Sequence, residues 1–482
     1  LRKEPRLYYH IRKNITASQT YGIITIRGPR RVGKTTLIKL IIKYLIEHER
    51  VNPKTIFYIS LDYEGLRDVE LTELLSAIAR TSNLDKYVFL DEASMYPRWA
   101  QALKNMYDAN LITKGKMKMI AAGSHSMDLA EAASKLRGRQ GRLAQLFNVG
   151  GNLIHVPLRF PEVVEALRGE MDVFLSQRKF RRAGSRFRIL QELASGTIPS
   201  VIQDIYDNYF QLLQRVFEDY LIHGGYPRAI DEYRRNGSIG NDFYSDVAEL
   251  LIKDSERAGL YPENLKRLVE VLIEPKRLSA TISFRDLEVV GYDEDARPKK
   301  KFGLRDYLDY LRTTWTFFFT AREEGRHGSC RPNLQEHVKN YVLDPFIYHA
   351  LYAYLRNIPD PFNYSVKLVG DEAFRGRLVE SVVASHLLLS QQLFERIQSV
   401  DYTNVLLYQP SATSGSDEER ETDFVLCIKK GAGHYRFTIE SKYRRSPSHV
   451  LPQKGKIILT RDVLRIKNNM VFIPVSLFLL LF

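Results

Sequence analysis

Residues Gly28 to Thr35 read GPRRVGKT and fit the pattern G-x-x-x-x-G-K-[ST], which limits the folds open to this chain more than any other segment. An apolar segment, residues 21–27, precedes the motif and predicts a strand, and residues 36–46 follow it with apolar residues at helical spacing. Glycines let backbone amides surround an anion, and the start of the helix adds unpaired N–H groups. The segment therefore predicts a phosphate site.

Two side chains at the end of this motif have defined roles in such a site. We expect Lys34 to reach the β- and γ-phosphates of a nucleotide, and Thr35 to place its hydroxyl on Mg²⁺. ATP and Mg²⁺ are therefore the expected cofactors. The residues predicted to contact the nucleotide are Gly28, Pro29, Arg30, Arg31, Val32, Gly33, Lys34, Thr35 and Thr36.

An acidic pair follows a second apolar segment, in the sequence KYVFLDE that ends at Glu92. A buried parallel strand presents its last residues at the same sheet edge as the phosphate loop. We expect Asp91 to hold Mg²⁺, directly or through water, and Glu92 to polarise the water that attacks the γ-phosphate. The two motifs together predict hydrolysis of ATP.

Two further candidates follow along the chain. A strand is predicted over residues 118–122, and a polar residue at its end would lie between the two motif strands, so Ser124 is assigned to sense the γ-phosphate. Arg139 is a candidate arginine finger for the nucleotide of a neighbouring subunit. A surface arginine explains Arg139 equally well.

Length and composition set the class of protein. The chain has 482 residues, too many for one hydrophobic core, and its 44% hydrophobic and 27% charged residues predict a soluble protein of several domains. We recognise no signal peptide, and the longest apolar run, from Met470 to Phe482, is too short to span a bilayer. A cytoplasmic location without a membrane partner is therefore expected, although a chain that begins at Leu1 does not define its natural N-terminus.

Charge and cysteine content narrow the expected surroundings. The formal net charge is +14, which favours an anionic partner such as nucleic acid, unless the charge is spread evenly for solubility. The two cysteines, Cys330 and Cys427, lie far apart in sequence. They suggest no disulfide framework and no cysteine metal site, so a reducing interior is expected.

The motifs GPRRVGKT, FLDE, GSHS and LRGR, in this order, resemble those of a family of archaeal and bacterial AAA-type P-loop ATPases. In that family the ATPase module is joined to a C-terminal region of poorly defined function with a restriction-endonuclease-like fold. The Gly-Gly-Tyr-Pro segment that ends at Pro227 is similar to a further family motif, whereas His125 and Arg137 depart from the family pattern.

The resemblance implies an α/β protein with three parts. We expect a P-loop NTPase domain of AAA type with a parallel sheet over residues 1–170, a helical and winged-helix region over 171–325, and a nuclease-like α/β domain over 326–482.

The middle region contains three predicted helices, at residues 264–273, 283–290 and 303–314. Short connections between them suggest a winged-helix unit. A basic run, residues 297–301, precedes the third helix, which carries Arg305 and Arg312, as a reader of the DNA major groove requires. A helical lid that packs on the ATPase domain is the alternative.

The C-terminal region has the spacing of a PD-(D/E)-x-K nuclease core. Asp423 and Glu440 would hold Mg²⁺, and Lys442 would orient or activate water. Positions 440 and 442 face the same side of a strand, and Glu380, on a predicted helix, could complete the site. A nuclease-like fold used for binding or assembly explains the same residues.

The sequence therefore leads to one principal hypothesis and two alternatives. The principal one is a DNA-associated ATPase whose nucleotide state gates its other domains. The alternatives are a nucleotide switch that acts through protein partners or a homo-oligomer without DNA, and a metal-dependent nuclease.

Overall fold

The computed structural model describes most of the chain, in stretches separated by short gaps. The described residues are 6–66, 68–123, 135–136, 138–147, 151–178, 180, 182–283, 285, 287, 303–324, 329–394, 405–409, 422–443 and 455–482. Predicted features that fall outside these residues include Ser124, the helix predicted over 283–290 apart from three of its residues, and the basic run 297–301.

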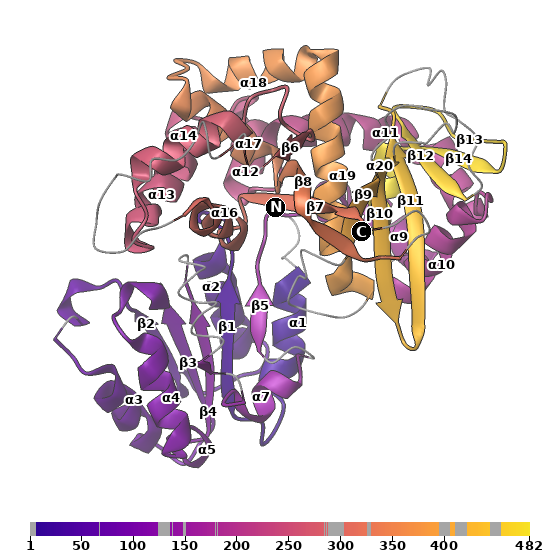
Figure 1. Cartoon of the computed structure of the whole chain (residues 1–482). Coiled ribbons are helices and arrows are strands. Elements are labelled where there is room, and N and C mark those ends of the chain that lie inside the picture. Colours follow the sequence, from indigo (N-terminus) through magenta and orange to yellow (C-terminus); the bar gives the residue numbers. More distant parts are fainter. Residues whose placement is uncertain are drawn as a thin grey trace.

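Five strands of the N-terminal part form a parallel sheet in the order β2-β3-β4-β1-β5 (Figure 1). The predicted strands are confirmed, and the three central ones, β1, β3 and β4, run through apolar residues buried on both faces of the sheet, as parallel sheets require. The strands are β1 (Gly22–Arg27), β2 (Ile56–Ser60), β3 (Lys86–Asp91), β4 (Met117–Ala122) and β5 (Asn152–Ile154).

Helices cover both faces of this sheet. Helix α2 begins at Lys34, directly after the phosphate-loop motif, and packs with α1 against one face, where Ile38 and Ile41 are fully buried. Three other helices cover the opposite face. The helices are α1 (Arg6–Ile15), α2 (Lys34–Glu47), α3 (Leu71–Arg80), α4 (Trp99–Asp108) and α5 (Leu111–Lys114), and a short helix α7 (Gly141–Gln145) lies beside β1.

The rest of the described chain shares one large hydrophobic cluster, which runs from Ile154 to Phe482. It joins a layer of helices to a second sheet. The helices are α8 (Phe160–Leu167), α9 (Gly169–Gln177), α10 (Ala183–Ala194), α11 (Ser200–His223), α12 (Pro227–Asn236), α13 (Asn241–Arg257), α14 (Pro262–Leu272), α16 (Leu304–Thr313), α17 (Pro345–Leu355), α18 (Pro361–Gly370), α19 (Glu372–Phe394) and α20 (Val475–Phe478).

Nine strands of the described residues form the second sheet, in the order β13-β14-β12-β11-β10-β9-β7-β8-β6. It is mixed: β10 runs antiparallel to both of its neighbours, β9 and β11, whereas β7 and β9, β11 and β12, and β12 and β14 pair in parallel. The strands are β6 (Thr281–Ser283), β7 (Phe317–Glu323), β8 (Pro332–Val342), β9 (Leu406–Gln409), β10 (Thr422–Lys430), β11 (Gly433–Ser441), β12 (Lys456–Thr460), β13 (Arg465–Lys467) and β14 (Met470–Pro474).

Both predicted domain boundaries differ from the structure. The boundary at 325/326 divides the second sheet, because β7 pairs with β9 across it. The boundary at 170/171 assigns α8 to the predicted ATPase domain. In the structure, Phe160 of α8 instead packs edge-on against Phe217 of α11, with ring centroids 5.3 Å apart, so α8 belongs to the second body. The described chain therefore has two bodies with separate cores rather than three domains, and the chain passes from the first body to the second near residue 154.

The predicted winged-helix unit is only partly visible. Its first and third helices correspond to α14 and α16, and residues 281–283 form strand β6 at the edge of the large sheet. Helix α16 lies next to the N-terminal sheet in Figure 1 and leads directly into β7. This position is closer to that of the helical lid, which the sequence left as the alternative.

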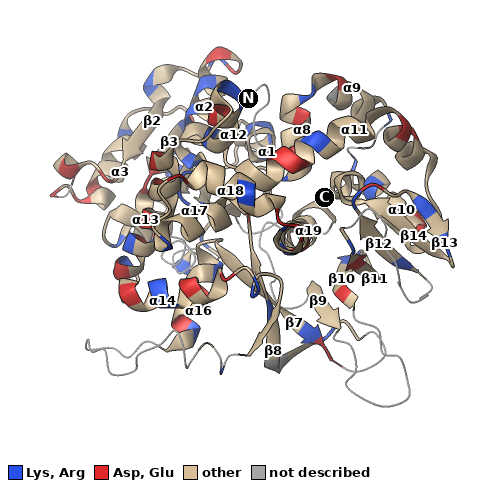
Figure 2. Cartoon of the chain, turned by 90° about the horizontal axis from the view of Figure 1, so that it is seen from above, with Lys and Arg blue, Asp and Glu red and all other residues tan. Residues whose placement is uncertain are grey.

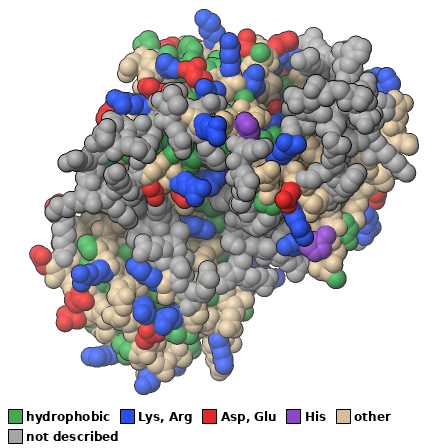
Figure 3. All heavy atoms as spheres, in the orientation of Figure 1, with side chains coloured by type: hydrophobic (Ala, Val, Ile, Leu, Met, Phe, Trp, Pro, Cys, Tyr) green, Lys and Arg blue, Asp and Glu red, His purple; other side chains and the backbone are tan. Residues whose placement is uncertain are grey.

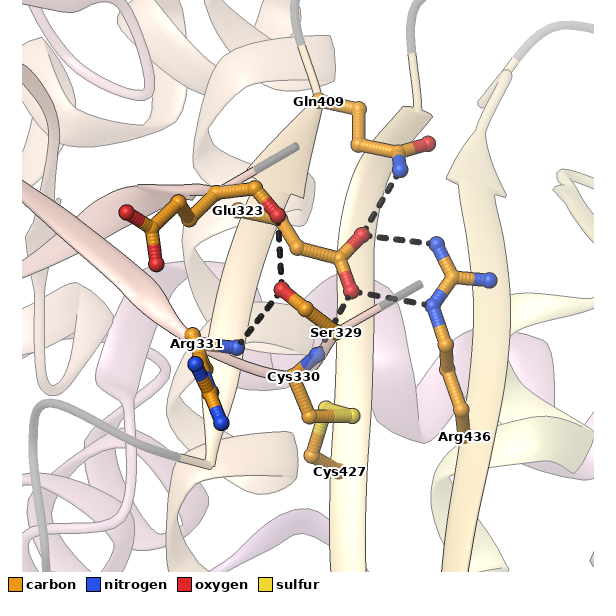
Figure 4. The surroundings of a disulfide bond; sticks show 8 residues. Glu323, Ser329, Cys330, Arg331, Gln409, Cys427 and Arg436 are labelled. Atoms are coloured by element: carbon orange, nitrogen blue, oxygen red, sulfur yellow. Dashed lines mark hydrogen bonds and ion pairs between the residues drawn. A yellow bond between two sulfur atoms is a disulfide. The ribbon is translucent and has the colours of Figure 1, made fainter. Parts of the chain in front are cut away.

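A disulfide joins Cys330 to Cys427, with an S–S distance of 2.05 Å, so the expectation of unlinked cysteines was wrong (Figure 4). The two residues are 97 positions apart, but the sheet brings them to one face, where they pack with Ala321 of β7 and Val425 of β10. Sequence separation therefore gave no measure of their distance.

Beside the disulfide lies a buried carboxylate. Glu323 is fully buried and accepts hydrogen bonds from the guanidinium of Arg436 and from the Gln409 amide, at 2.7 to 3.1 Å (Figure 4). It also accepts one from the backbone N–H of Cys330 at 3.0 Å. The carboxylate thus links the segment that follows β7 to strands β9 and β11.

The Gly224-Gly225-Tyr226-Pro227 motif is explained by a close approach of backbones. A Cβ on Gly225 would lie 1.9 Å from the carbonyl oxygen of Leu158, and one on Gly224 would lie 1.9 Å from Oδ1 of Asp344. Asp344 caps α17 by accepting a hydrogen bond from the N–H of Phe346 at 2.9 Å, and its Oδ2 accepts the N–H of Gly225 at 2.7 Å. The motif therefore joins three helices through one buried carboxylate.

Asp344 is expected to make stability depend on pH. Burial raises its pKa from 3.8 to about 7, so the folded chain holds a proton that the unfolded chain releases between about pH 4 and pH 7. Its contribution to the free energy of unfolding is therefore present below about pH 4 and is lost as pH rises to 7. In Asp344→Asn the unfolding free energy, measured by urea titration, should fall less over this range.

The exposed helix cap Asp360 offers the matched control. Its carboxylate accepts the N–H of Asn363 at 3.2 Å at the start of α18. Asp360→Asn should leave the pH dependence unchanged. Equal slopes for the wild type and Asp344→Asn would contradict the assignment.

Candidate nucleotide site

The phosphate-loop motif has the backbone geometry of an anion cradle. Gly33 has a φ of 97°, a left-handed conformation that favours glycine, and it stands directly before the first residue of α2. A Cβ on Gly28 would lie 1.8 Å from the carbonyl oxygen of His155, which follows β5. Both glycines are therefore required by the local fold, one for its φ and one for close packing.

The Lys34 side chain is buried inside this loop. Its ammonium donates to the carbonyl oxygens of Gly28 at 3.0 Å and Pro29 at 2.7 Å. Burial lowers the pKa of Lys34 to about 8, while the carboxylates of Glu92 and Asp91 act in the opposite direction. The ammonium is thus charged at neutral pH and is held in the loop by backbone oxygens.

The acidic pair stands at the end of β3, as predicted. Strand β4 lies between β1 and β3, so the end of β3 and the phosphate loop meet at the same sheet edge. The Asp91 carboxylate is buried, and its Oδ1 accepts the N–H of Glu92 at 3.0 Å. Glu92 has a φ of 47°, an uncommon conformation for a residue with a side chain, of the kind often found at functional sites.

The structure adds a residue that sequence reasoning missed. Tyr58 of β2 donates its hydroxyl to Oδ2 of Asp91 at 2.8 Å. Strand β2 pairs with β3 in parallel, which places Tyr58 beside the acidic pair. Nothing in the sequence around Tyr58 marks it, because it is one aromatic residue in an ordinary strand pattern.

A cavity of about 380 Å³ opens where these elements meet. It brings together the motif and the acidic residue Glu92, and it includes Leu250 from α13 of the second body, which the sequence did not connect with the site. Its lining residues are Arg30, Arg31, Gly33, Lys34, Thr35, Thr36, Glu92 and Leu250.

The residues present fit a magnesium nucleotide. Lys34 supplies a charged group beside the cavity, and Thr35 and Asp91 supply a hydroxyl and a carboxylate at the same sheet edge. Hydroxyl and carboxylate oxygens, together with phosphate oxygens, are ligands that Mg²⁺ prefers.

The predicted arginine finger lies elsewhere in this chain. Arg139 donates to the carboxylate of Asp108 at 2.8 Å, and the next residue, Gln140, accepts the backbone N–H of Ile23 at the start of β1. The phosphate loop follows the opposite end of β1, about 15 Å away at the ~3.3 Å rise per residue of a strand. Arg139 therefore does not reach the site of its own chain, and a role in a neighbouring subunit stays a prediction.

The residues predicted for a nuclease-like site do come together in the second body. Asp423 accepts the N–H of Ser441 at 2.8 Å, next to Glu440, and shares the ammonium of Lys339 with Glu380 at 3.1 and 3.2 Å. Lys442 forms an ion pair with Glu440 at 2.9 Å, and Lys456 pairs with the second oxygen of Glu440.

This cluster carries its own positive charges. Three carboxylates face three ammonium groups, and burial together with the neighbouring Asp423 raises the pKa of Glu380 to about 7. Lys339 stands between two of the three predicted metal ligands. In this arrangement the residues do not fit a divalent cation, and the described part of the chain holds no group of three His, Cys, Asp or Glu placed to bind a metal ion.

Removal of the Lys339 ammonium should destabilise the fold. Lys339→Met leaves Glu380 and Asp423 buried without a cation between them, and the expected loss is about 3–5 kcal/mol of unfolding free energy at pH 7. A second change, Glu380→Gln, should restore part of it. Urea titration of the single and double variants measures both values.

Lys442→Met is the matched control for this prediction. Lys442 is half-exposed, and Glu440 still pairs with Lys456 after the Lys442 ammonium is removed. The expected loss of unfolding free energy is therefore about 1 kcal/mol or less. If Lys339→Met proves as mild as Lys442→Met, the lysine does not neutralise the carboxylates.

Comparisons with known proteins agree with the geometry of the first body. Residues 20–164 match a family model described as an AAA domain, and residues 214–359 match one described as a domain of unknown function. The chain is 24% identical over 473 residues to "Uncharacterized protein MJ1637" of Methanocaldococcus jannaschii, a match that covers 95% of this chain and 85% of that protein.

Similar solved structures include two from Aeropyrum pernix. The ORC2 protein is 15% identical with a TM-score of 0.31, over 73% of this chain and 92% of that one. The ORC1 protein in complex with DNA is 14% identical with a TM-score of 0.27, over 74% and 92%. Domain III of the Thermotoga maritima replication initiation protein DnaA is 14% identical with a TM-score of 0.25, over 50% and 89%.

The strand order, the phosphate loop before α2, the acidic pair on β3 and the family match over residues 20–164 lead to one conclusion. The first body has the fold of a P-loop NTPase domain, and its residues 20–164 match the AAA domain model.

Proposed function

We propose that the chain binds ATP with Mg²⁺, hydrolyses it, and uses the nucleotide state to control the helices of its second body. The observation that carries this proposal is the convergence of Lys34, Asp91 and Glu92 at one sheet edge, beside a cavity whose wall includes Leu250 of α13.

Each residue has a role that follows from its position. Lys34 neutralises charge on the β- and γ-phosphates, and Thr35 and Asp91 are the residues that would hold Mg²⁺, which when bound offsets phosphate charge. Glu92 lines the cavity and accepts a proton from the attacking water. Tyr58 keeps the Asp91 carboxylate in place through its hydroxyl.

DNA association is the second part of the proposal. It is supported by the net charge of +14, which favours an anionic partner. Lys and Arg are interspersed with Asp and Glu over α13, α14 and α16 in Figure 2, and over the face shown in Figure 3. Among the residues that the structure describes, these helices and this face are not uniformly basic, so the support is the total charge.

A partner switch without DNA is the second candidate, and the position of α16 favours it. The helix buries Tyr307, Tyr310 and Leu311, and the Tyr310 hydroxyl donates to the carbonyl oxygen of Leu251 in α13 at 2.6 Å. Tyr310 also lines a small cavity of about 30 Å³ with Pro29 and Arg30 of the phosphate loop. A helix that lines a cavity together with the loop in this way is suited to report the nucleotide state.

The expected cytoplasmic location depended in part on cysteines that stay reduced, and the disulfide removes that support. No helix among the residues that the structure describes is both long and apolar enough to cross a membrane. The Cys330–Cys427 bond, however, is of a kind that is rare in reducing compartments, and this speaks against a reducing environment.

ATP turnover with and without double-stranded DNA tests the proposal. Glu92→Gln should lower kcat by about 10²-fold or more, because it removes the general base, while ATP binding persists. Stimulation by DNA in the wild type, lost in Glu92→Gln and weakened steeply by salt, is expected for a DNA-associated ATPase.

Glu73→Gln, an exposed change on α3, is the control and should leave turnover unchanged. Turnover indifferent to DNA, with no DNA binding at low salt, would favour the partner switch. A wild type that does not hydrolyse ATP would contradict both candidates.

A further inference from the structure

Two arginines of the phosphate loop are bound by acids of α13. The guanidinium of Arg30 forms a bidentate ion pair with Asp254, with Nη2 donating to Oδ1 at 2.7 Å and Nε donating to Oδ2. Arg31 pairs with Asp246 at 3.1 Å. The two pairs connect the P-loop domain to the second body at the edge of the nucleotide cavity.

The acids lie on one face of α13. Asp246, Leu250 and Asp254 are spaced by four residues, so their side chains follow one another along the same side of the helix. Leu250 lines the cavity, and so do Arg30 and Arg31. This face of α13 is therefore one wall of the proposed ATP site.

Each acid also has a second arginine from its own body. Asp254 lies 3.4 Å from the guanidinium of Arg257, and Asp246 lies 3.6 Å from that of Arg228. Loss of a buried carboxylate's only cation is costly, but neither of these acids depends on the loop arginine alone. The arrangement therefore permits Arg30 and Arg31 to leave while both acids keep a partner.

Phosphate offers the same arginines an alternative partner. A guanidinium binds phosphate oxygens and carboxylates with the same bidentate geometry. Both arginines are placed where a nucleotide held by Lys34 would bring its phosphates. Phosphates and the α13 acids thus compete for the same two cations.

We propose that α13 senses the nucleotide by partner exchange: ATP phosphates take Arg30 and Arg31 from Asp254 and Asp246, which then keep Arg257 and Arg228. The exchange loosens α13 from the phosphate loop when ATP is bound and restores the contact when it leaves. This rests on the proposed ATP binding and specifies how the nucleotide state reaches the second body.

The first test is the affinity for ATP, measured by calorimetry on the full chain. Asp254→Asn removes the competitor of the phosphates and should tighten ATP binding about 5-fold or more, a coupling of ordinary allosteric size. Arg30→Ala should weaken ATP binding. When Asp254→Asn is added to Arg30→Ala, the affinity for ATP should change little, because Asp254 no longer has an arginine for which it competes with the phosphates. Glu249→Gln, on the same helix but paired with Lys253, is the matched control and should have no effect.

The second test measures the contact itself. Amide hydrogen exchange in residues 241–257 should speed up when ATP binds to the wild type. It should change less in Arg30→Ala with saturating ATP, where only the Arg31–Asp246 pair is left to exchange. Asp246→Asn, at a half-exposed position, should tighten ATP binding in the same direction but less. It therefore tests the exchange even if the buried Asp254→Asn does not fold.

The outcomes separate the two proposals. If the wild type does not bind ATP, both fail. If the wild type binds ATP but neither Asp254→Asn nor Asp246→Asn tightens binding, or α13 shows no change on binding, only the exchange is overturned.

Discussion

The parallel arrangement of β1, β3 and β4 is the constraint on which the proposed chemistry depends. Strands that run in the same direction end at the same edge, so the phosphate loop after β1 and the acidic pair after β3 meet there although some 60 residues of chain separate them. The conformation of the loop requires glycine at position 28, where the backbone lies so close to the carbonyl oxygen of His155 that a side chain has no room. Lys34 is then held inside the loop by its own carbonyl oxygens.

Helix α13 of the second body forms part of the wall of the nucleotide cavity at this edge, and α16 lies beside the phosphate loop. The contact with α13 is electrostatic rather than apolar: its acids bind two arginines of the loop, and arginines of the second body bind the same acids. Because ion pairs can be exchanged for phosphate contacts, such a contact is able to respond to charge in the cavity. An apolar contact has no charged group that could exchange a carboxylate for a phosphate, so it would change only if the nucleotide displaced its atoms.

In the large sheet, residues with the spacing of a metal site come together around ammonium groups. Lys339 lies on β8, which pairs with β7 and is far from β10 in sequence. Its ammonium lies between the carboxylates of Glu380 and Asp423. Buried carboxylates require compensating positive charge, and lysine supplies it here. The same spacing of residues can therefore mark a cluster of carboxylates and lysines as well as a binding site for a metal cation.

The sequence by itself determined the local elements with strong patterns: the phosphate loop, the strands beside it, the acidic pair and the helix that starts at Lys34. Each depends on neighbours within a few residues, through glycine conformation and apolar spacing. Only the tertiary structure decided which distant residues complete the site, such as Tyr58 and Asp254. It also decided the disulfide, Lys339 among the acids, and the two-body division, because strand order and helix packing bring together residues whose separation in sequence carries no information about their distance.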